Sequence, residues 1–292
     1  MANVVIDDTH LSDIAAAIRE KNGLTDTYKP SEMAAAIQAI TTSSGDPDTP
    51  GDDPIVSTID FDDYIGRSLS GEVEFACTRI GRYGLAGCNY VTKFTVDGDG
   101  CGVSAFVGCS SLQELSLPNA TEFGTECCYK LTKLATVNAP QAVTINDNAF
   151  TACSALTTIT LGDVKVVGDE AFKECTALTK IDFGAHEQAH SYYSMYHGAK
   201  LGGDIFSYCD NLTAIIFRGN EVPLAQSYAS PFPDHFKASY SGLLEPGYIY
   251  VPRDMIETYQ TYNGNTSGLY PYYDHFSMMN YRAIEDYPEI CG

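Results

Sequence analysis

One short sequence pattern recurs along the middle of the chain and limits what it can fold into. The copy at Gly168–Phe183 has the sequence GDEAFKECTALTKIDF. Five further copies, two of them looser, end at Val96, Leu117, Val137, Leu161 and Phe217. Self-similarity at a nearly fixed period indicates a stack of like structural units.

Each copy contains a cysteine that is followed by apolar residues three and six positions later. These cysteines are Cys88, Cys109, Cys128, Cys153, Cys175 and Cys209, and their successive separations are 21, 19, 25, 22 and 34 residues. Four of the five separations are close to the roughly 20–29 residues of one leucine-rich-repeat coil. The fifth separation indicates one coil with an insertion. In the third copy this alignment predicts that Leu131 and Leu134 face inward, whereas Lys133 and Ala135 face outward.

The spacing of the apolar residues predicts a short strand in each coil. Alternate residues of a strand point to the same side, so the apolar ones would face a core. One coil cannot bury that face alone, but stacked coils share a continuous core. The Ala-Phe pairs, such as Ala149-Phe150 and Ala171-Phe172, predict a second inward column. The outward positions, which include Ala214 and Ile216, are chemically mixed and indicate no particular binding surface.

The pattern AFxxCxxLxxIxL resembles the BspA-like leucine-rich repeat of bacterial surface proteins and of phage or prophage tail proteins. The resemblance covers roughly residues 80–217. It implies a repeat solenoid, a β-rich horseshoe with a small N-terminal helical module and a mixed α/β C-terminal cap. It also implies binding to other macromolecules and no particular reaction.

The chain contains ten cysteines, six of which belong to the repeat. Stacked positions lie about 4.8 Å apart, which is within disulfide reach, so spacing alone leaves bridges open. The start, MANVVIDDTH, lacks a basic region followed by a continuous apolar region, so we expect no secretory signal. We therefore expect the repeat cysteines to be reduced, buried fillers. Cys127 is interpreted as the exposed neighbour of Cys128.

Two short helical patterns precede the repeats. Their segment, LSDIAAAIREKNGLTDTYKPSEMAAAIQAI, is similar to the N-terminal helical module of phage and prophage tail or baseplate-associated proteins. Helices of about ten residues are marginal alone in water. We therefore interpret residues 1–40 as an attachment or oligomerisation module, with a plain N-terminal helical hairpin as the alternative.

The remaining boundaries follow from composition. Residues 41–54 contain no apolar side chain and are predicted to be a linker. Residues 55–220 form the leucine-rich-repeat domain, with an insertion at 184–200. Residues 221–292 resemble the C-terminal cap of the same phage-borne proteins, with a strand ending in Tyr-Val-Pro, a helix and a closing Arg-Ala-Ile segment. Members of that group often carry a Trp here, whereas this chain has none.

The net charge of −21 excludes several classes of partner. A nucleic-acid partner requires a footprint of Lys and Arg, so none is expected. Attraction to an anionic membrane surface is disfavoured for the same reason. No apolar run approaches the roughly 18 residues of a membrane span, so we expect no membrane insertion.

The insertion contains the chain's most distinctive polar cluster. His186, Glu187 and His190 form a literal HExxH, the pattern of a zinc metallopeptidase. The segment directly follows a repeat strand and is too short for that scaffold, so His186 and His190 are only weak metal candidates and a surface loop is favoured. Long loops are often functional, and tyrosines provide rigid contact area. The candidate binding residues are therefore Tyr192, Tyr193, Tyr196 and His197.

The sequence thus favours a structural or host-recognition protein of a phage virion, in its tail, baseplate or fibre. Expected partners are other virion tail proteins through residues 1–40, a host surface protein or polysaccharide, and a second copy of the chain as a homo-oligomer. We expect synthesis in the host cytoplasm, location in the virion, no cofactor and no catalytic residue. The alternatives are a bacterial surface or secreted adhesin and, more remotely, a metallopeptidase based on HEQAH.

Overall fold

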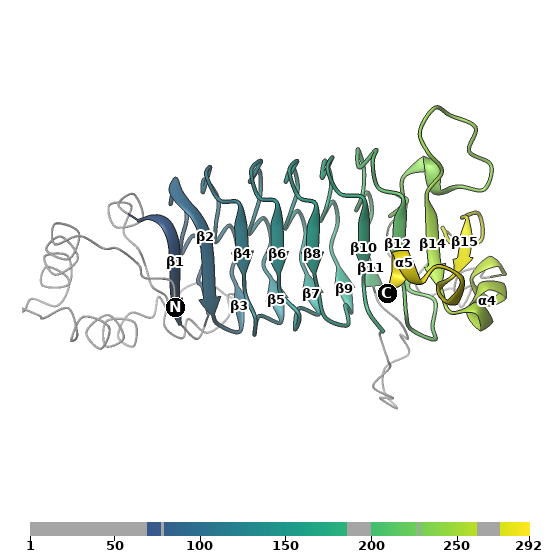
Figure 1. Cartoon of the computed structure of the whole chain (residues 1–292), viewed down its shortest axis with the longest axis horizontal. Coiled ribbons are helices and arrows are strands. Elements are labelled where there is room, and N and C mark those ends of the chain that lie inside the picture. The colour runs from purple at the N-terminus through teal and green to yellow at the C-terminus, as the bar shows by residue number, and fades with distance from the viewer. Residues whose placement is uncertain (1–68, 77–78, 186–199, 226, 228, 262–274) are drawn as a thin grey trace, which may run out of the picture.

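The computed structural model describes residues 69–76, 79–185, 200–225, 227, 229–261 and 275–292. These residues form a stack of flattened coils that expose one sheet at the front and one at the back (Figure 1). The predicted N-terminal module at 1–40, the linker at 41–54 and most of the insertion lie outside the described residues.

The front sheet has two parts, a five-stranded part in the order β1-β2-β4-β6-β8 and a four-stranded part in the order β10-β12-β14-β15. Every strand pair in it is parallel. The strands are β1 Ser70–Ala76, β2 Tyr90–Asp97, β4 Glu114–Ser116, β6 Thr136–Asn138, β8 Thr158–Thr160, β10 Lys180–Asp182, β12 Ala214–Ile216, β14 Tyr248–Val251 and β15 Tyr281–Ala283.

The back sheet is continuous and parallel, in the order β13-β11-β9-β7-β5-β3. Its strands are β3 Gly100–Cys101, β5 Glu122–Phe123, β7 Thr144–Ile145, β9 Val166–Val167, β11 Lys200–Leu201 and β13 Leu224–Ala225. The second residue of each strand is apolar and buried, which fits the alternation of side chains along a strand.

Short helices occur only toward the C-terminal end of the described chain. They are the 3-10 helices η1 Asp234–Phe236, η2 Arg253–Met255 and η3 Ile284–Asp286, and the α-helices α4 Ile256–Gln260 and α5 Pro288–Cys291. Within the described ranges, no helix has the length and apolarity that crossing a membrane requires.

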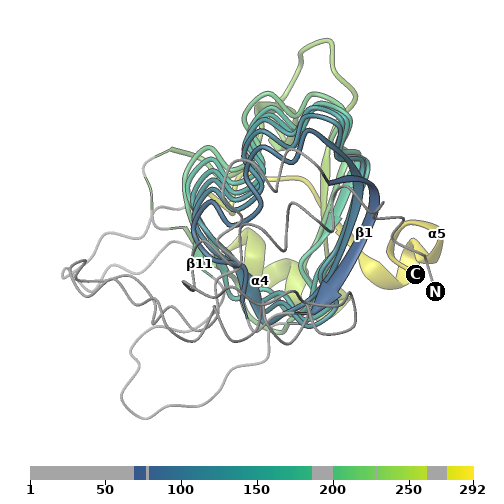
Figure 2. The same ribbon diagram turned by 90° about the vertical axis from the view of Figure 1, so that its left-hand side faces the viewer.

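The stack of coils is nearly straight, so the expected horseshoe is wrong (Figure 1). A horseshoe needs wider elements on its outer side than on its inner side. Here both faces of each coil carry strands, and strands stack about 4.8 Å apart. Equal spacing on the two faces leaves no reason for the stack to bend. Figure 2 shows the coils superposed when viewed along this axis.

The predicted inward columns are confirmed. Phe150 is fully buried, and its ring stacks on that of Phe172 with a centroid distance of 5.3 Å and an interplanar angle of 5°. Phe206 extends the stack beyond Phe172 at 5.7 Å. On the other side, Phe123 from the back sheet contacts Phe150 at 4.9 Å. The aromatic rings therefore tie successive coils together through one shared core.

The cysteine-based alignment of the third copy is wrong by three residues. Val137 pairs with Leu115 on one side and Ile159 on the other, so it is the inward residue of β6. Leu134 is buried but precedes the strand, as do Lys133 and Ala135.

Leu131 therefore takes the cysteine position of this coil. The equivalent positions in successive coils are then 109, 131, 153 and 175, and each is 22 residues after the one before. Cys127 and Cys128 replace the Ala-Phe pair, because Phe106 N–H donates to the Cys127 carbonyl as Phe150 N–H donates to that of Ala171. Cys127 is consequently fully buried, which corrects its interpretation as an exposed residue.

The repeat cysteines are buried as predicted, and they also have a polar role. Cys175 Sγ donates to the Phe150 carbonyl at 3.2 Å, and Cys209 Sγ donates to the Phe172 carbonyl at 3.0 Å. In both cases the acceptor belongs to the preceding coil. A thiol combines small apolar volume with a weak S–H donor, so it fits a buried position beside an available carbonyl.

Candidate functional site

The regular ladder of the front sheet is interrupted between β8 and β10, and we call this interruption the seam. Between regular coils, the Thr136 N–H donates to the Gln113 carbonyl and the Leu117 N–H donates to the Asn138 carbonyl. The equivalent bonds, from Lys180 to Thr157 and from Leu161 to Asp182, are absent among the described residues. The seam is therefore lined by backbone donors and acceptors whose equivalents in the regular coils are hydrogen-bonded to each other.

The seam is a local opening that is closed at both ends. At one end, Ala152 N–H donates to the Lys173 carbonyl at 2.8 Å. At the other end, Val164 N–H donates to the Phe183 carbonyl at 2.9 Å. Behind it, β9 and β11 remain paired in the back sheet. Such a site suits a compact ligand group better than a long extended chain.

The seam coincides with a change of residue at the corner that follows each front strand. Pro118 and Pro140 occupy this corner in the two preceding coils, and Gly162 and Gly184 occupy it in the next two. Proline restricts φ to about −65°, whereas Gly184 has a φ of 73°, which glycine adopts readily. The corner hydrogen bond changes with the residue. Ala142 N–H donates within its own coil, but Val164 N–H donates to the next coil.

A pocket of about 1160 Å³ lies over the seam. Its floor includes Ile159 and Leu161, which the repeat pattern predicts to be buried but which are only half-buried here. The hydroxyl-bearing lining residues are Thr157, Thr158, Thr160 and Thr179. Apolar atoms in the floor and hydroxyl groups around it are suited to binding a small ligand.

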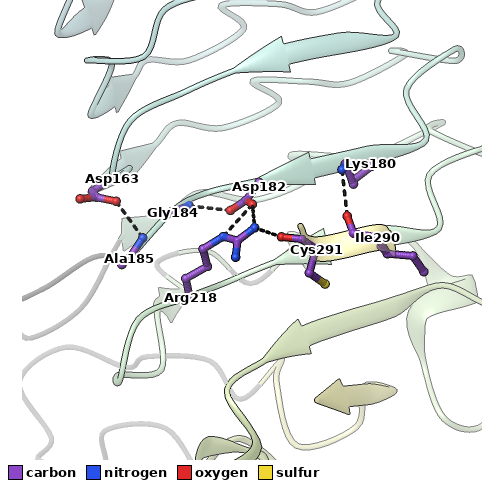
Figure 3. Close-up of polar contacts among 8 residues, drawn as sticks. All are labelled: Asp163, Lys180, Asp182, Gly184, Ala185, Arg218, Ile290 and Cys291. Carbon is purple, nitrogen blue, oxygen red and sulfur yellow. Dashed lines mark hydrogen bonds and ion pairs between the residues drawn. The ribbon is translucent and has the colours of Figure 1, made fainter. Parts of the chain in front are cut away.

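Charged groups surround one side of the pocket. Arg218 donates from Nη2 to Asp182 Oδ2 at 2.7 Å and from Nε to the same oxygen at 2.9 Å (Figure 3). The hydrogen bond from the Asp182 carboxylate raises the pKa of Arg218 above its ordinary value. Asp182 Oδ1 also accepts the Gly184 N–H at 2.9 Å. The Arg218 and Asp182 charges therefore neutralise each other.

Three other charged side chains have no opposite charge of their own among the described residues. Lys180 Nζ donates to the neutral Ile290 carbonyl at 2.9 Å. The Lys165 side chain has no ion pair or hydrogen bond within the described part of the chain, and the Asp163 carboxylate accepts only the Ala185 N–H, at 2.8 Å. The side chains of the lining thus carry three positive and two negative charges, and Gly292, the last residue of the sequence, also lines the pocket.

Helix α5 ends beside the pocket, where Gly292, the residue that follows the helix, belongs to the lining. The end of the helix is held by the Lys180 bond to Ile290 and by a hydrogen bond from Arg218 to the Cys291 carbonyl (Figure 3). The helix covers Ala214 and Ile216, which are 4% and 0% exposed. Their interpretation as part of the mixed outer surface is therefore wrong. In the sequence, two apolar residues at outward positions of the same strand already indicated that another element covers that strand.

The structure does not describe the predicted site residues. Tyr192, Tyr193, Tyr196 and His197, and the weak metal candidates His186 and His190, lie outside the described residues. Ala185, which immediately precedes them, lines the pocket. Across the described ranges, no group of three or more His, Cys, Asp or Glu side chains could hold a metal ion. Sequence reasoning missed the seam itself, although the exchange of Pro for Gly at the corner marks it.

Comparison with known proteins gives a family for the repeats. Residues 78–200 match the BspA type leucine rich repeat region in six copies. No curated protein matches the chain.

Two solved structures are similar to the chain. One is a leucine-rich repeat protein from Bacteroides ovatus, with 20% identity, a TM-score of 0.41 and coverage of 73% of this chain and 53% of the other. The second is a leucine rich cell surface protein from Faecalibacterium prausnitzii, with 13% identity, a TM-score of 0.31 and coverage of 74% and 88%. This chain spans about half the length of the Bacteroides ovatus chain.

Proposed function

Because residues 78–200 match leucine-rich repeats of the BspA type, we propose that the chain is a binding module that presents the seam pocket to a macromolecule on a host cell. One observation carries this proposal. Within the described chain, the backbone hydrogen bonds of the front sheet are interrupted at one place, between β8 and β10. A pocket of about 1160 Å³ lies at that place.

The energetic argument supports a binding role. A backbone hydrogen bond contributes about 0.5–1.5 kcal/mol net, so the missing ladder between β8 and β10 has a measurable cost. Departures from local regularity are expected mainly at functional sites. The match of residues 78–200 to BspA type leucine-rich repeats supports binding rather than catalysis as the role of this pocket.

The second part of the proposal is that this module belongs to a phage virion, as a tail, baseplate or fibre protein. It is supported by the similarity of residues 1–40 to tail-protein modules, given by the Ile14–Arg19 run and by Lys29–Met33. In this proposal residues 1–40 attach the chain to other virion proteins or to a second copy. Residues 221–292 close the C-terminal end of the stack.

Deletion of residues 1–40 tests the virion role. The truncated protein should keep the melting temperature of the full chain, because the linker at 41–54 has no apolar side chain to pack. It should fail to enter the particle, as measured by immunoblotting of purified virions. Normal incorporation would contradict attachment through this module. Detection of the full chain on bacterial envelopes without particles would favour the adhesin alternative.

Filling the pocket tests the binding role. Thr160→Arg places a long side chain in the pocket lining, and Ser116→Arg makes the same change two coils away on β4. Binding of fluorescent protein to host cells should fall severalfold for the first variant only. Equal binding by both variants would show that the seam is not the contact site.

A further inference from the structure

We propose that the seam pocket binds an acidic sugar, with Lys165 and Lys180, which both line the pocket, as the cations that attract its anionic groups. This inference deepens the proposed binding function and rests on it. It names the ligand class from the chemistry that the pocket combines, namely ammonium groups, hydroxyl groups, one available carboxylate and an apolar floor.

The two lysines that lack an opposite charge among the described residues indicate that the ligand carries an anionic group. Arg218 is neutralised by Asp182, but Lys165 has no polar partner among the described residues and Lys180 donates only to a backbone carbonyl. A carboxylate or phosphate of the ligand that lies beside either ammonium group would accept charge-assisted hydrogen bonds from it. The chain as a whole has a net charge of −21 and would repel an anion at long range, so binding of such a ligand depends on these local contacts.

The hydroxyl, carboxylate and apolar groups of the lining indicate that the ligand is a sugar ring. Thr158, Thr160 and Thr179 can each donate and accept hydrogen bonds. The carboxylate of Asp163 accepts one hydrogen bond, from the Ala185 N–H, and keeps acceptor capacity for ring hydroxyls. Ile159 provides partly exposed apolar surface for the C–H face of the ring. Because the seam is closed at both ends by coil-to-coil bonds, the site favours a compact ring over an extended peptide.

The experiment compares trigalacturonate with neutral galactotriose by calorimetry on the full chain. We expect the acid to bind, the neutral sugar to bind at least tenfold more weakly, and the affinity for the acid to fall with added salt. Equal affinity for the two sugars, or no binding of the acid at millimolar concentration, would overturn the proposal. Tighter binding of triglutamate would replace the sugar by an acidic peptide and would overturn it as well.

Two variants localise the effect. Lys165→Gln and Lys180→Gln should each weaken trigalacturonate binding about tenfold, the loss expected for one charge-assisted hydrogen bond. When Lys180 is replaced, the hydrogen bond from Arg218 to the Cys291 carbonyl still holds the end of α5. Lys133→Gln, at an exposed position before β6, is the matched control and should change nothing. An equal loss in the control would mean general charge attraction and would contradict the assigned site.

Failure of this inference can be distinguished from failure of the binding role. If Thr160→Arg abolishes host-cell binding while trigalacturonate does not bind, the pocket is functional and the ligand class is wrong. If trigalacturonate binds as expected while Thr160→Arg leaves host-cell binding intact, the sugar site is real and the cell-contact role is wrong.

Discussion

Arg218 and Asp182, which are 36 residues apart, form an ion pair in which two guanidinium N–H groups share one carboxylate oxygen. Arg218 follows β12, and Asp182 is the last residue of β10. Arg218 also donates to the Cys291 carbonyl at the end of α5. One side chain therefore connects two coils of the solenoid to the end of α5, beside the pocket.

Replacing Arg218 with Ala should loosen α5 and lower stability modestly. A partly exposed ion pair contributes up to about 1 kcal/mol, and a change of that size lowers the melting temperature by about 2–4 °C. Amide exchange at residues 288–291 should accelerate because the bond to Cys291 is lost. Arg253→Ala is the control, since its pair with Asp286 is more exposed, at 59% and 52%. If both variants behave alike, Arg218 has no particular role in holding α5.

Replacing Phe150 with Ala should be severely destabilising. The ring is fully buried between Phe123 and Phe172, and loss of a buried Phe side chain costs about 3–5 kcal/mol. Urea unfolding followed by circular dichroism measures the change. Tyr90→Ser, at a side chain that is 66% exposed, should stay within about 0.5 kcal/mol. A loss below about 1 kcal/mol for Phe150→Ala would show that the aromatic column is not a source of stability.

Stability should fall as the solution becomes alkaline. Burial raises the pKa of Cys128 and of Cys209 from 9.0 to about 12, because the thiolate is desolvated in the core. In the unfolded chain the same thiols ionise near the ordinary value of 9.0, so the folded state binds more protons above that pH. The stabilisation is therefore complete below about pH 9 and is lost as the pH rises toward about 12.

Urea unfolding at about pH 8, 9.5 and 11 measures this loss, which is at most about 1.4 kcal/mol per pH unit for each thiol. Other groups titrate in this range, so the double variant C128A/C209A is the comparison. Its stability should fall less steeply across the upper part of the range. Identical slopes for the two proteins would show that these thiols do not control the alkaline loss.

Replacing Tyr192, Tyr193 and Tyr196 together with Ser tests the recognition role predicted for the insertion. Surface changes usually stay within about 0.5 kcal/mol each, so the melting temperature should hardly change while binding to host cells or wall polysaccharide falls. Collapse of stability would mean that these tyrosines belong to a core. Survival of both properties would make the insertion passive and leave recognition to other surfaces.

Much of the solenoid could be predicted from local pattern. Leu115, Ile181 and Ile215 stand at the predicted inward positions because alternation along a strand depends only on neighbouring residues. The third coil could not be placed in this way. Its Cys128 and Leu131 are both apolar and buried, so either can be aligned with the repeat cysteine, and only pairing with the flanking coils distinguishes them.

The candidate site was less predictable than the fold. The sequence predicted a functional region at the insertion, and the pocket lining includes Ala185, immediately before the six named site residues and candidates. The pocket itself depends on two relationships between distant residues. One is the missing ladder between Thr157 and Lys180, and the other is the contact of Arg218 with Cys291.

The period of the coils, the inward columns and the buried cysteines follow from side-chain spacing and hydrophobicity within one repeat, so the amino-acid order is enough to determine them. The place where the front sheet opens and the outward residues that become covered depend on tertiary contacts. Ile159 is half-buried and Ile216 fully buried, although the repeat pattern predicts the reverse. The physical reason is that burial depends on what lies opposite a residue. Ile159 lies next to β10, which is not hydrogen-bonded to its own strand β8. Ile216 is covered by the helix α5, which comes much later in the chain.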